Sequence, residues 1–293
     1  MTDLGPGQAR IIDRGYRTYK GERSGVPGAV RSVVVHSVQR ALGLRRTLWA
    51  KLLPFASVLI AYLPAVVFVG TVALIDLDDV PDDFLPTYGD YYGFIIAAIM
   101  VFVALVAPEV LCTDRRSGML GVYLSSPLDR DTYLVSKGLA IASVLSLVCL
   151  GPPLLMLVAN VLQSQGPDGF ADTVVTLLRV LGAGLALTLL YTGVTMGVAS
   201  LTDRKTVAAA AIILLFLMSL TVTGVLTSTG SAFGIRGASP TLLSLDLASR
   251  IHGERSVIMR GTSSAVVWGA WFVWTAGGFA LARFNLQRLP VTR

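Results

Sequence analysis

The sequence predicts an all-α integral membrane protein with six transmembrane helices, because of its apolar runs, its composition and the charges between the runs. Six segments are long enough to cross a bilayer, since a helix needs about 20 apolar residues to span the hydrocarbon core. They are 52–75, 92–112, 138–162, 174–201, 206–227 and 263–283. The chain is 54% hydrophobic and 14% charged, too apolar for a soluble domain of 293 residues.

Charges between the spans alternate in sign, and this alternation predicts the orientation. Residues 1–51 carry ten Lys and Arg residues, whereas the loop at 76–91 carries six Asp and no base. Bases recur after the second, fourth and sixth spans, with the long loop before the last span as the exception. Because basic loops stay in the cytoplasm, we expect both termini there. The net charge of +6 then reflects contact with the lipid bilayer, and no nucleic-acid partner is expected.

Three parts follow from this layout: a cytoplasmic N-terminal segment at 1–51, a six-helix transmembrane domain at 52–283 and a cytoplasmic tail at 284–293. In the first part, apolar residues recur at helical spacing over 28–51. They are Val34, Val38, Leu42 and Trp49. This pattern predicts an amphipathic helix lying in the membrane interface, with a basic linker without fixed structure as the alternative.

Signatures of catalysis and metal binding are absent from the sequence, so we expect that the chain is not an enzyme and holds no metal. There is no Gly-x-x-x-x-Gly-Lys-Ser/Thr loop, no His-Glu-x-x-His and no Gly-x-Ser-x-Gly. His36 and His252 fall on opposite sides of the predicted membrane, which excludes a shared metal site. We also expect no acid–base pair at mid-membrane, which ion-coupled transporters usually need. The chain is therefore predicted to take its energy from another subunit.

The cytoplasmic segment between the second and third spans, from Glu109 to Lys137, is the candidate receiver of that energy. It begins with a polar hinge formed by Asp114, Arg115, Arg116, Ser117 and Gly118. A short helix is predicted next, because apolar residues follow at i, i+3 and i+4. These residues are Leu120, Tyr123 and Leu124. An exposed amphipathic turn is a surface that a soluble partner can hold; a loop lying on the inner leaflet is the alternative.

Proline marks the end of this short helix. Pro127 drives the residue before it out of the helical region, so the helix is expected to stop at Ser126. Asp129 or Asp131 can then cap the helix that becomes the third span.

This segment resembles the membrane permeases of ABC type-2 exporters. Those permeases have six spans and carry, between the second and third, an acid, a charged cluster with Gly, a Leu-rich stretch, Pro, Arg, an aromatic residue and Lys. The matching residues are Glu109, 114–118, Leu120, Leu124, Pro127, Arg130, Tyr133 and Lys137. The stretch GYRTYKG at 15–21 is similar to actinobacterial members. Met119 departs from the Thr that is common in the family.

The resemblance implies a transmembrane permease subunit of an ATP-driven exporter in a bacterial cell membrane. It implies a coupling helix between spans two and three that docks on a separate ABC ATPase subunit, which would bind the ATP and Mg. This chain would bind no cofactor. It would form the pathway as a dimer with a second copy or a paralogous permease. An ATP-independent carrier or channel, and a non-transporting membrane anchor or assembly subunit, are the alternatives from other classes.

The long loop before the last span carries a candidate outer gate. Ser239 and Pro240 form a good helix start, because Ser caps the helix and Pro suits its first position. The apolar side of this helix is expected to comprise Leu242, Leu245 and Leu247 or Ala248. In the resembled family, short helices here help to close the outer mouth; a peripheral helix without a gating role is the alternative.

A Gly-x-x-x-Gly pair lies in the fourth span. Gly193 and Gly197 permit close approach of a second helix. We expect packing within the chain more than dimerisation.

Overall fold

The computed structural model describes residues 21, 25–44, 48–74, 86–164, 166–167, 169–230, 233–255 and 257–288, and these residues form helices and no strand. In chain order the helices are α1 (Gly25–Ala41), α2 (Leu48–Leu74), α3 (Tyr88–Arg116), α4 (Leu120–Leu124), α5 (Arg130–Cys149), α6 (Gly151–Leu162), α7 (Gly169–Ala199), α8 (Lys205–Ser228), the 3-10 helix η2 (Phe233–Ala238), α9 (Pro240–His252) and α10 (Ser264–Arg288).

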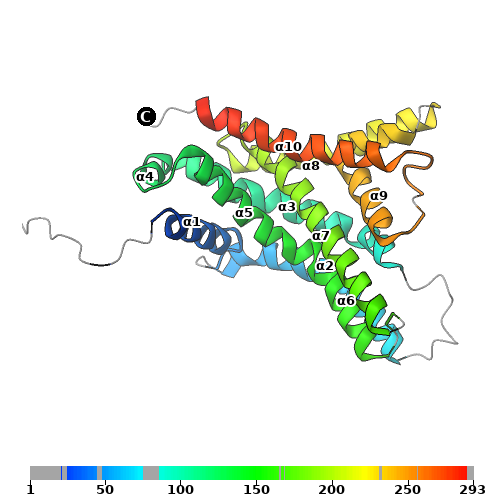
Figure 1. Cartoon of the computed structure of the whole chain (residues 1–293). Helices are drawn as coiled ribbons and strands as arrows, with labels where there is room; N and C mark the ends of the chain where they lie inside the picture. The colour runs from blue at the N-terminus through cyan, green and yellow to red at the C-terminus, as the bar shows by residue number, and fades with distance from the viewer. Residues whose placement is uncertain are drawn as a thin grey trace, which may run out of the picture.

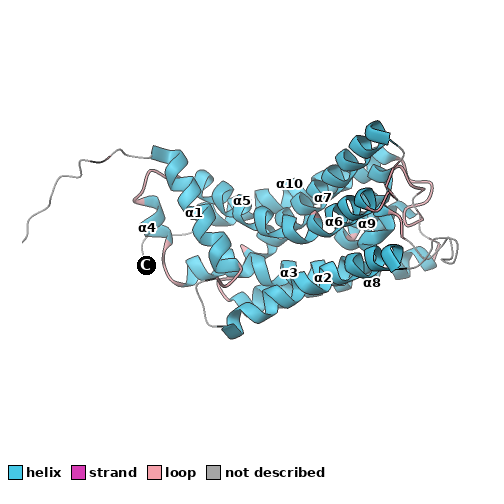
Figure 2. Cartoon of the chain, turned by 90° about the horizontal axis from the view of Figure 1, so that it is seen from below, coloured by secondary structure: helices cyan, strands magenta, loops and turns pink. Residues whose placement is uncertain are grey.

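Six of these helices are long and apolar enough to cross a membrane. They are Pro54–Leu74 of α2, then α3, α5, α7, α8 and α10. The prediction of six spans is confirmed, and the chain is a multi-pass membrane protein. Figure 1 shows α1, α4 and the end of α10 at one end of the bundle, which we call the α4 end, and α9 at the opposite end, the α9 end. Figure 2 shows the same separation from below.

The apolar run predicted as the third span, 138–162, is divided between two helices. α5 ends at Cys149 and α6 begins two residues later, because Pro152 and Pro153 follow. Proline has no N–H, so the carbonyl groups one turn earlier lose their partners within the helix. The hydroxyl of Tyr92 donates to the carbonyl oxygen of Cys149 at 3.0 Å. A neighbouring helix thus satisfies a backbone group that the break leaves open.

The N-terminal helix is shorter than the sequence predicted. α1 covers Gly25–Ala41 and not 28–51, and Trp49 lies in α2. The buried residues of α1 are spaced four apart, and they are Val33, Ser37 and Ala41. α1 packs against α5 and α3, with Val38 and Leu42 half-buried beside them. One side of this helix is therefore held by protein.

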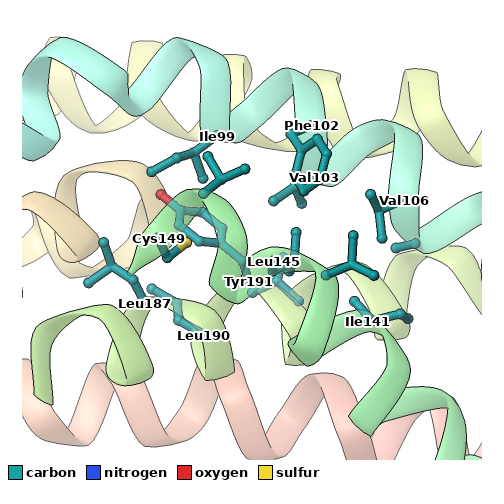
Figure 3. Packing of buried hydrophobic residues seen from close by; sticks show 14 of the residues in the cluster. Ile99, Phe102, Val103, Val106, Ile141, Leu145, Cys149, Leu187, Leu190 and Tyr191 are labelled. Carbon is teal, nitrogen blue, oxygen red and sulfur yellow. The ribbon is translucent and has the colours of Figure 1, made fainter. Parts of the chain in front are cut away.

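The core lies between α3, α5 and α7. Figure 3 shows side chains from these three helices filling the space between them. The labelled residues are Ile99, Phe102, Val103 and Val106 of α3, Ile141, Leu145 and Cys149 of α5, and Leu187, Leu190 and Tyr191 of α7. By contrast, α2, α8 and α10 bury only a small share of their apolar windows. Their apolar faces therefore point outward, where lipid or a second chain can cover them.

Gly193 and Gly197 of α7 lie against α10 of the same chain. A Cβ at Gly193 would come 2.5 Å from the carbonyl oxygen of Thr275, and one at Gly197 would come 3.0 Å from the Cα of Gly278. From the other side, a Cβ at Gly278 would overlap the carbonyl oxygen of Gly193. Small residues on both helices therefore let the two backbones touch.

We predict that Gly278→Ala destabilises the protein and that the neighbouring Gly277→Ala does not. The added methyl at Gly278 meets backbone, which cannot move aside, so the cost is about 1–3 kcal/mol. A Cβ at Gly277 meets nothing within 4 Å, and alanine favours a helix. Thermal unfolding of the two variants in the same detergent measures the difference, and equal midpoints would contradict close α7–α10 packing.

Candidate functional site

A buried group of charged and polar side chains joins three helices beside α4. Asp114, in the last turn of α3, is fully buried, and its carboxylate lies 2.6 Å from Nη2 of Arg40 and 2.5 Å from Nζ of Lys137. The same ammonium group donates to Oγ of Ser37 at 2.8 Å. The hydroxyl of Tyr133 donates to Asp114 at 3.1 Å. These five residues, the Asp114 cluster, link α1, α3 and α5.

The prediction of a polar hinge at 114–118 was wrong for residues 114–116. α3 continues to Arg116, so Asp114 is a buried helical residue, and the turn begins only at Ser117. Gly118 makes the turn with φ of +69°, a conformation that glycine adopts without strain. Likewise Lys137 lies inside α5 and not in the loop before it.

The sequence analysis expected no acid–base pair at mid-membrane, and it overlooked a pair near the ends of two spans. Asp114 and Lys137 both lie in candidate spans and contact each other, toward the helix ends at the α4 end. No local signal marks this pair, because Asp114 lies between Thr113 and Arg115, and Lys137 lies between Ser136 and Gly138.

α4 covers the Asp114 cluster with its aromatic side chain. The Nζ atom of Lys137 lies 5.2 Å from the ring centre of Tyr123 and 5.4 Å from that of Tyr133. Burial raises the pKa of the Tyr123 hydroxyl, and the charge of Asp114 raises it further. Leu120 is buried and Leu124 packs against the core. The predicted apolar face of this helix therefore contacts its own bundle.

The outward side of α4 presents a different set of residues. Met119 is 37% exposed and Val122 is 61% exposed, with Ser125 exposed on the same side one turn later. The exposed residues around this helix are Arg116, Ser117, Gly118 and Pro127. The surface that a partner can touch is therefore centred on Val122, and we call Met119, Val122 and Ser125 the α4 surface.

Two predicted residues at the end of α3 contact the connection between α7 and α8. Nη1 of Arg115 donates to the carbonyl oxygens of Ser200 and, at 3.3 Å, of Thr202. Glu109 lies 3.4 Å from Nζ of Lys205 at the start of α8. The end of α3 is thus bonded both to α1 and α5 and to the α7–α8 connection.

The start of α5 is held by a cap and by a contact to α10. Of the two predicted caps, Asp129 is the one used: it accepts from the backbone N–H of Thr132 at 2.7 Å. Hydrogen bonds from Thr132 hold the pKa of Asp129 below its usual range. Nη1 of Arg130 donates to the carbonyl oxygens of Gln287 and, at 3.3 Å, of Leu286, so the start of α5 lies against the end of α10.

At the opposite end, α9 begins as predicted. Ser239 is its N-cap and Pro240 is its first residue. Leu242 and Leu245 are only half-buried. The apolar residues of α9 that are fully buried are Leu243, Leu247 and Ala248. The helix packs against α3 and α7, and Oγ of Ser244 lies 2.7 Å from the hydroxyl oxygen of Tyr191.

Buried polar contacts fix α9 to the loop that precedes α10. Asp246 lies 2.7 Å from Nε of Arg250 and accepts from the backbone N–H of Met259 at 3.1 Å. Burial lowers the pKa of His252 to about 4, and the positive charge of the nearby Arg179 also lowers it. The imidazole ring is therefore uncharged at pH 7. The contacts of Asp246 therefore hold α9 against the loop that precedes α10.

We predict that Asp114→Asn is strongly destabilising. The change leaves Lys137 and Arg40 without their counter-charge in a buried place, which costs about 3–5 kcal/mol. Asp131→Asn is the matched control: it removes a half-exposed pair with Arg283, which solvent screens, so it should cost far less stability. Thermal unfolding in detergent compares the two, and a small effect at Asp114 would show that the cluster does not hold the helices together.

Comparison with known proteins places the chain in a family. A search of the curated proteins returns no match. The family model described as ABC-2 family transporter protein matches residues 14–288, which include all six candidate spans and the residues on both sides of α4. The chain therefore belongs to the ABC-2 transporter family, as a membrane permease subunit of an ABC transporter.

Proposed function

We propose that the chain forms the transmembrane half of an ATP-driven exporter, and that the α4 surface receives the movement of a separate ABC ATPase subunit. One observation carries this proposal: a short helix with Met119 and Val122 exposed places Tyr123 over the Asp114 cluster, which links three other helices. ATP and Mg would be bound by the partner, where phosphoryl transfer takes place. This chain would supply the pathway and bind no cofactor itself.

Short connections would pass a displacement of α4 to two spans. Three residues separate the end of α3 from the start of α4, and five residues separate the end of α4 from the start of α5. Separating Asp114 from its two cations would leave charges unpaired in a buried place, so α1, α3 and α5 should move together. The contacts of Arg115 and Arg130 extend this movement toward α8 and α10. Transport then requires that the ATPase contact the α4 surface differently in two states.

The same proposal includes the orientation and the assembly. With the positive-inside rule, the α4 end and both termini lie in the cytoplasm of a bacterial cell. The pathway would lie between two permeases, identical or paralogous, because α2 and α8 turn apolar faces outward. At the α9 end, the helix that begins with Ser239 and Pro240 and carries Leu242 and Leu245 would close the outer mouth.

The Asp114 cluster favours one rival function, a carrier driven by an ion gradient, since ionisable residues in spans often serve as ion sites. Against it, the Asp114 carboxylate already contacts two cations and a tyrosine hydroxyl. Transport that stops on ATP depletion and survives collapse of the proton and sodium gradients supports the exporter. The opposite result supports the carrier.

We predict that Val122→Asp separates the permease from its ATPase without unfolding it. The side chain is exposed, so the fold should tolerate the charge, whereas burial of that charge in an interface should reduce co-purification about tenfold or more. Val257→Asp is the control, because Val257 is 62% exposed in the loop that follows α9, at the opposite end of the bundle. The measurement is the amount of ATPase subunit recovered with the tagged chain; equal recovery from both variants would remove α4 as the docking surface.

A further inference from the structure

An apolar groove of about 470 Å³ opens on the side of the bundle between α5 and α10, with α7 as its floor. Its lining includes Leu134, Val135, Leu139, Ala142, Leu189 and Phe279. Both α5 and α10 pack on α7, but the two contact each other only slightly, which leaves the space between them open. The volume is in the range that holds a small ligand.

The position of the groove indicates an apolar occupant from the bilayer. α5, α7 and α10 are all candidate spans. Val135 is 58% exposed, Leu139 is 50% exposed and Leu189 is 41% exposed, so the groove walls continue into an apolar outer surface. In a membrane protein such a surface meets lipid chains.

One end of the groove carries a pair of opposite charges. Nε and Nη2 of Arg283 donate to the two carboxylate oxygens of Asp131 at 2.8 and 2.7 Å, and both residues line the groove. Each side chain is about half exposed, at 57% for Arg283 and 50% for Asp131. Asp131 is the second residue of α5, so the pair lies at the α4 end of the span, at the level where lipid headgroups are expected.

Each partner of this pair has bonding capacity left. Nη1 of Arg283 bonds to no residue within the described part of the chain, and each oxygen of Asp131 accepts one bond from Arg283 and has a lone pair to spare. The end of the groove therefore offers both a cationic donor and an anionic acceptor, side by side and open to solvent.

We propose that this groove binds one phospholipid with a zwitterionic, primary-amine headgroup of the phosphatidylethanolamine type. One acyl chain fills the groove. The phosphate accepts from Nη1 of Arg283, and the ammonium group donates to Asp131, as charge-assisted hydrogen bonds. A choline headgroup has no N–H to donate, and a glycerol headgroup can donate from its neutral hydroxyl groups but brings no positive charge to the carboxylate. The charges at the end of the groove thus match the ethanolamine headgroup best.

A lipid in this place would brace α5 against α10. Arg130, next to Asp131, already bonds to the last carbonyl groups of α10, so the lipid would extend an existing contact. The proposal concerns lipid binding alone, and it holds whether or not an ATPase docks on α4.

Lipid selectivity of the full-length protein tests the proposal. The chain is placed in nanodiscs of equal parts phosphatidylethanolamine, phosphatidylcholine and phosphatidylglycerol with identical acyl chains, then released into mild detergent. Native mass spectrometry counts the lipids that remain bound. The wild type should retain one phosphatidylethanolamine per chain, enriched about fivefold over each of the other two.

Three variants separate the headgroup contact from the groove. Asp131→Asn should bring the enrichment over phosphatidylglycerol close to one, while a lipid is still retained. Ala142→Phe, which fills the groove, should lose the bound lipid of every type. Ala280→Phe, at an exposed position of the same lining, repeats this test if the first filling variant does not fold. Arg288→Gln is the control: it removes an arginine of α10 that lies outside the groove, and this variant should retain lipids as the wild type does.

Several outcomes would overturn the proposal. The proposal is wrong if the wild type retains the three lipids in the proportions of the nanodisc. It is also wrong if Asp131→Asn shows the same phosphatidylethanolamine enrichment as the wild type. Preferential retention of phosphatidylglycerol would assign the groove to an anionic lipid instead. A stable dimer without bound lipid, dissociated by Ala142→Phe, would assign it to a second copy of the chain.

Discussion

The contact of Asp114 with Arg40 and Lys137 is the interaction on which the α4 end depends. A carboxylate with no exposed surface must have opposite charge beside it, because an unpaired buried charge is far more costly than an unpaired surface charge. The two cations come from α1 and α5, so the requirement fixes where both helices pack on α3. The position of α4 follows, since Tyr123 lies over the ammonium group of Lys137.

The two ends of the bundle are held in similar ways by different residues. At the α4 end, Arg115 and Arg130 bond to backbone carbonyl groups of neighbouring connections and helix ends. At the α9 end, Arg250 bonds to Asp246 and to the carbonyl oxygens of Met259 and Thr262. Arginine suits this role because its several donors can satisfy carbonyl groups that a helix end leaves open. Between the ends, glycine allows α7 and α10 to touch, whereas α5 contacts α10 only slightly and leaves a groove between them.

The sequence predicted the helices well and their mutual contacts poorly. Apolar length located all six spans, and cap chemistry located the starts of α5 and α9 at Asp129 and Ser239, because both are local signals. The sequence alone does not show that one helix ends before Pro152 and another begins, since nothing local shows whether a neighbouring helix will satisfy the freed carbonyl groups. Similarly, the burial of Asp114 depends on Arg40, which is far away in the chain and on a helix whose docking no local pattern reveals.

The orientation of α4 shows the same limit. Spacing identified a helix with an apolar side at Leu120, Tyr123 and Leu124, but an apolar side can face a partner or its own bundle. The structure turns that side inward and leaves Val122 outward. The functional segment was therefore located by its pattern, while the residues available to a partner depended on the tertiary packing.

The central claim is that the Asp114 cluster makes α1, α3 and α5 move as one body. Distance measurement by pulsed electron spin resonance tests it, with nitroxide labels at Val35→Cys on α1 and Val135→Cys on α5, both exposed positions. Cys112 and Cys149 are buried, so labelling should be selective. We expect one narrow distance distribution that ATP leaves unchanged in the complex and that broadens when Asp114→Asn is added. A broad distribution in the labelled parent, or one that Asp114→Asn does not alter, would contradict the claim.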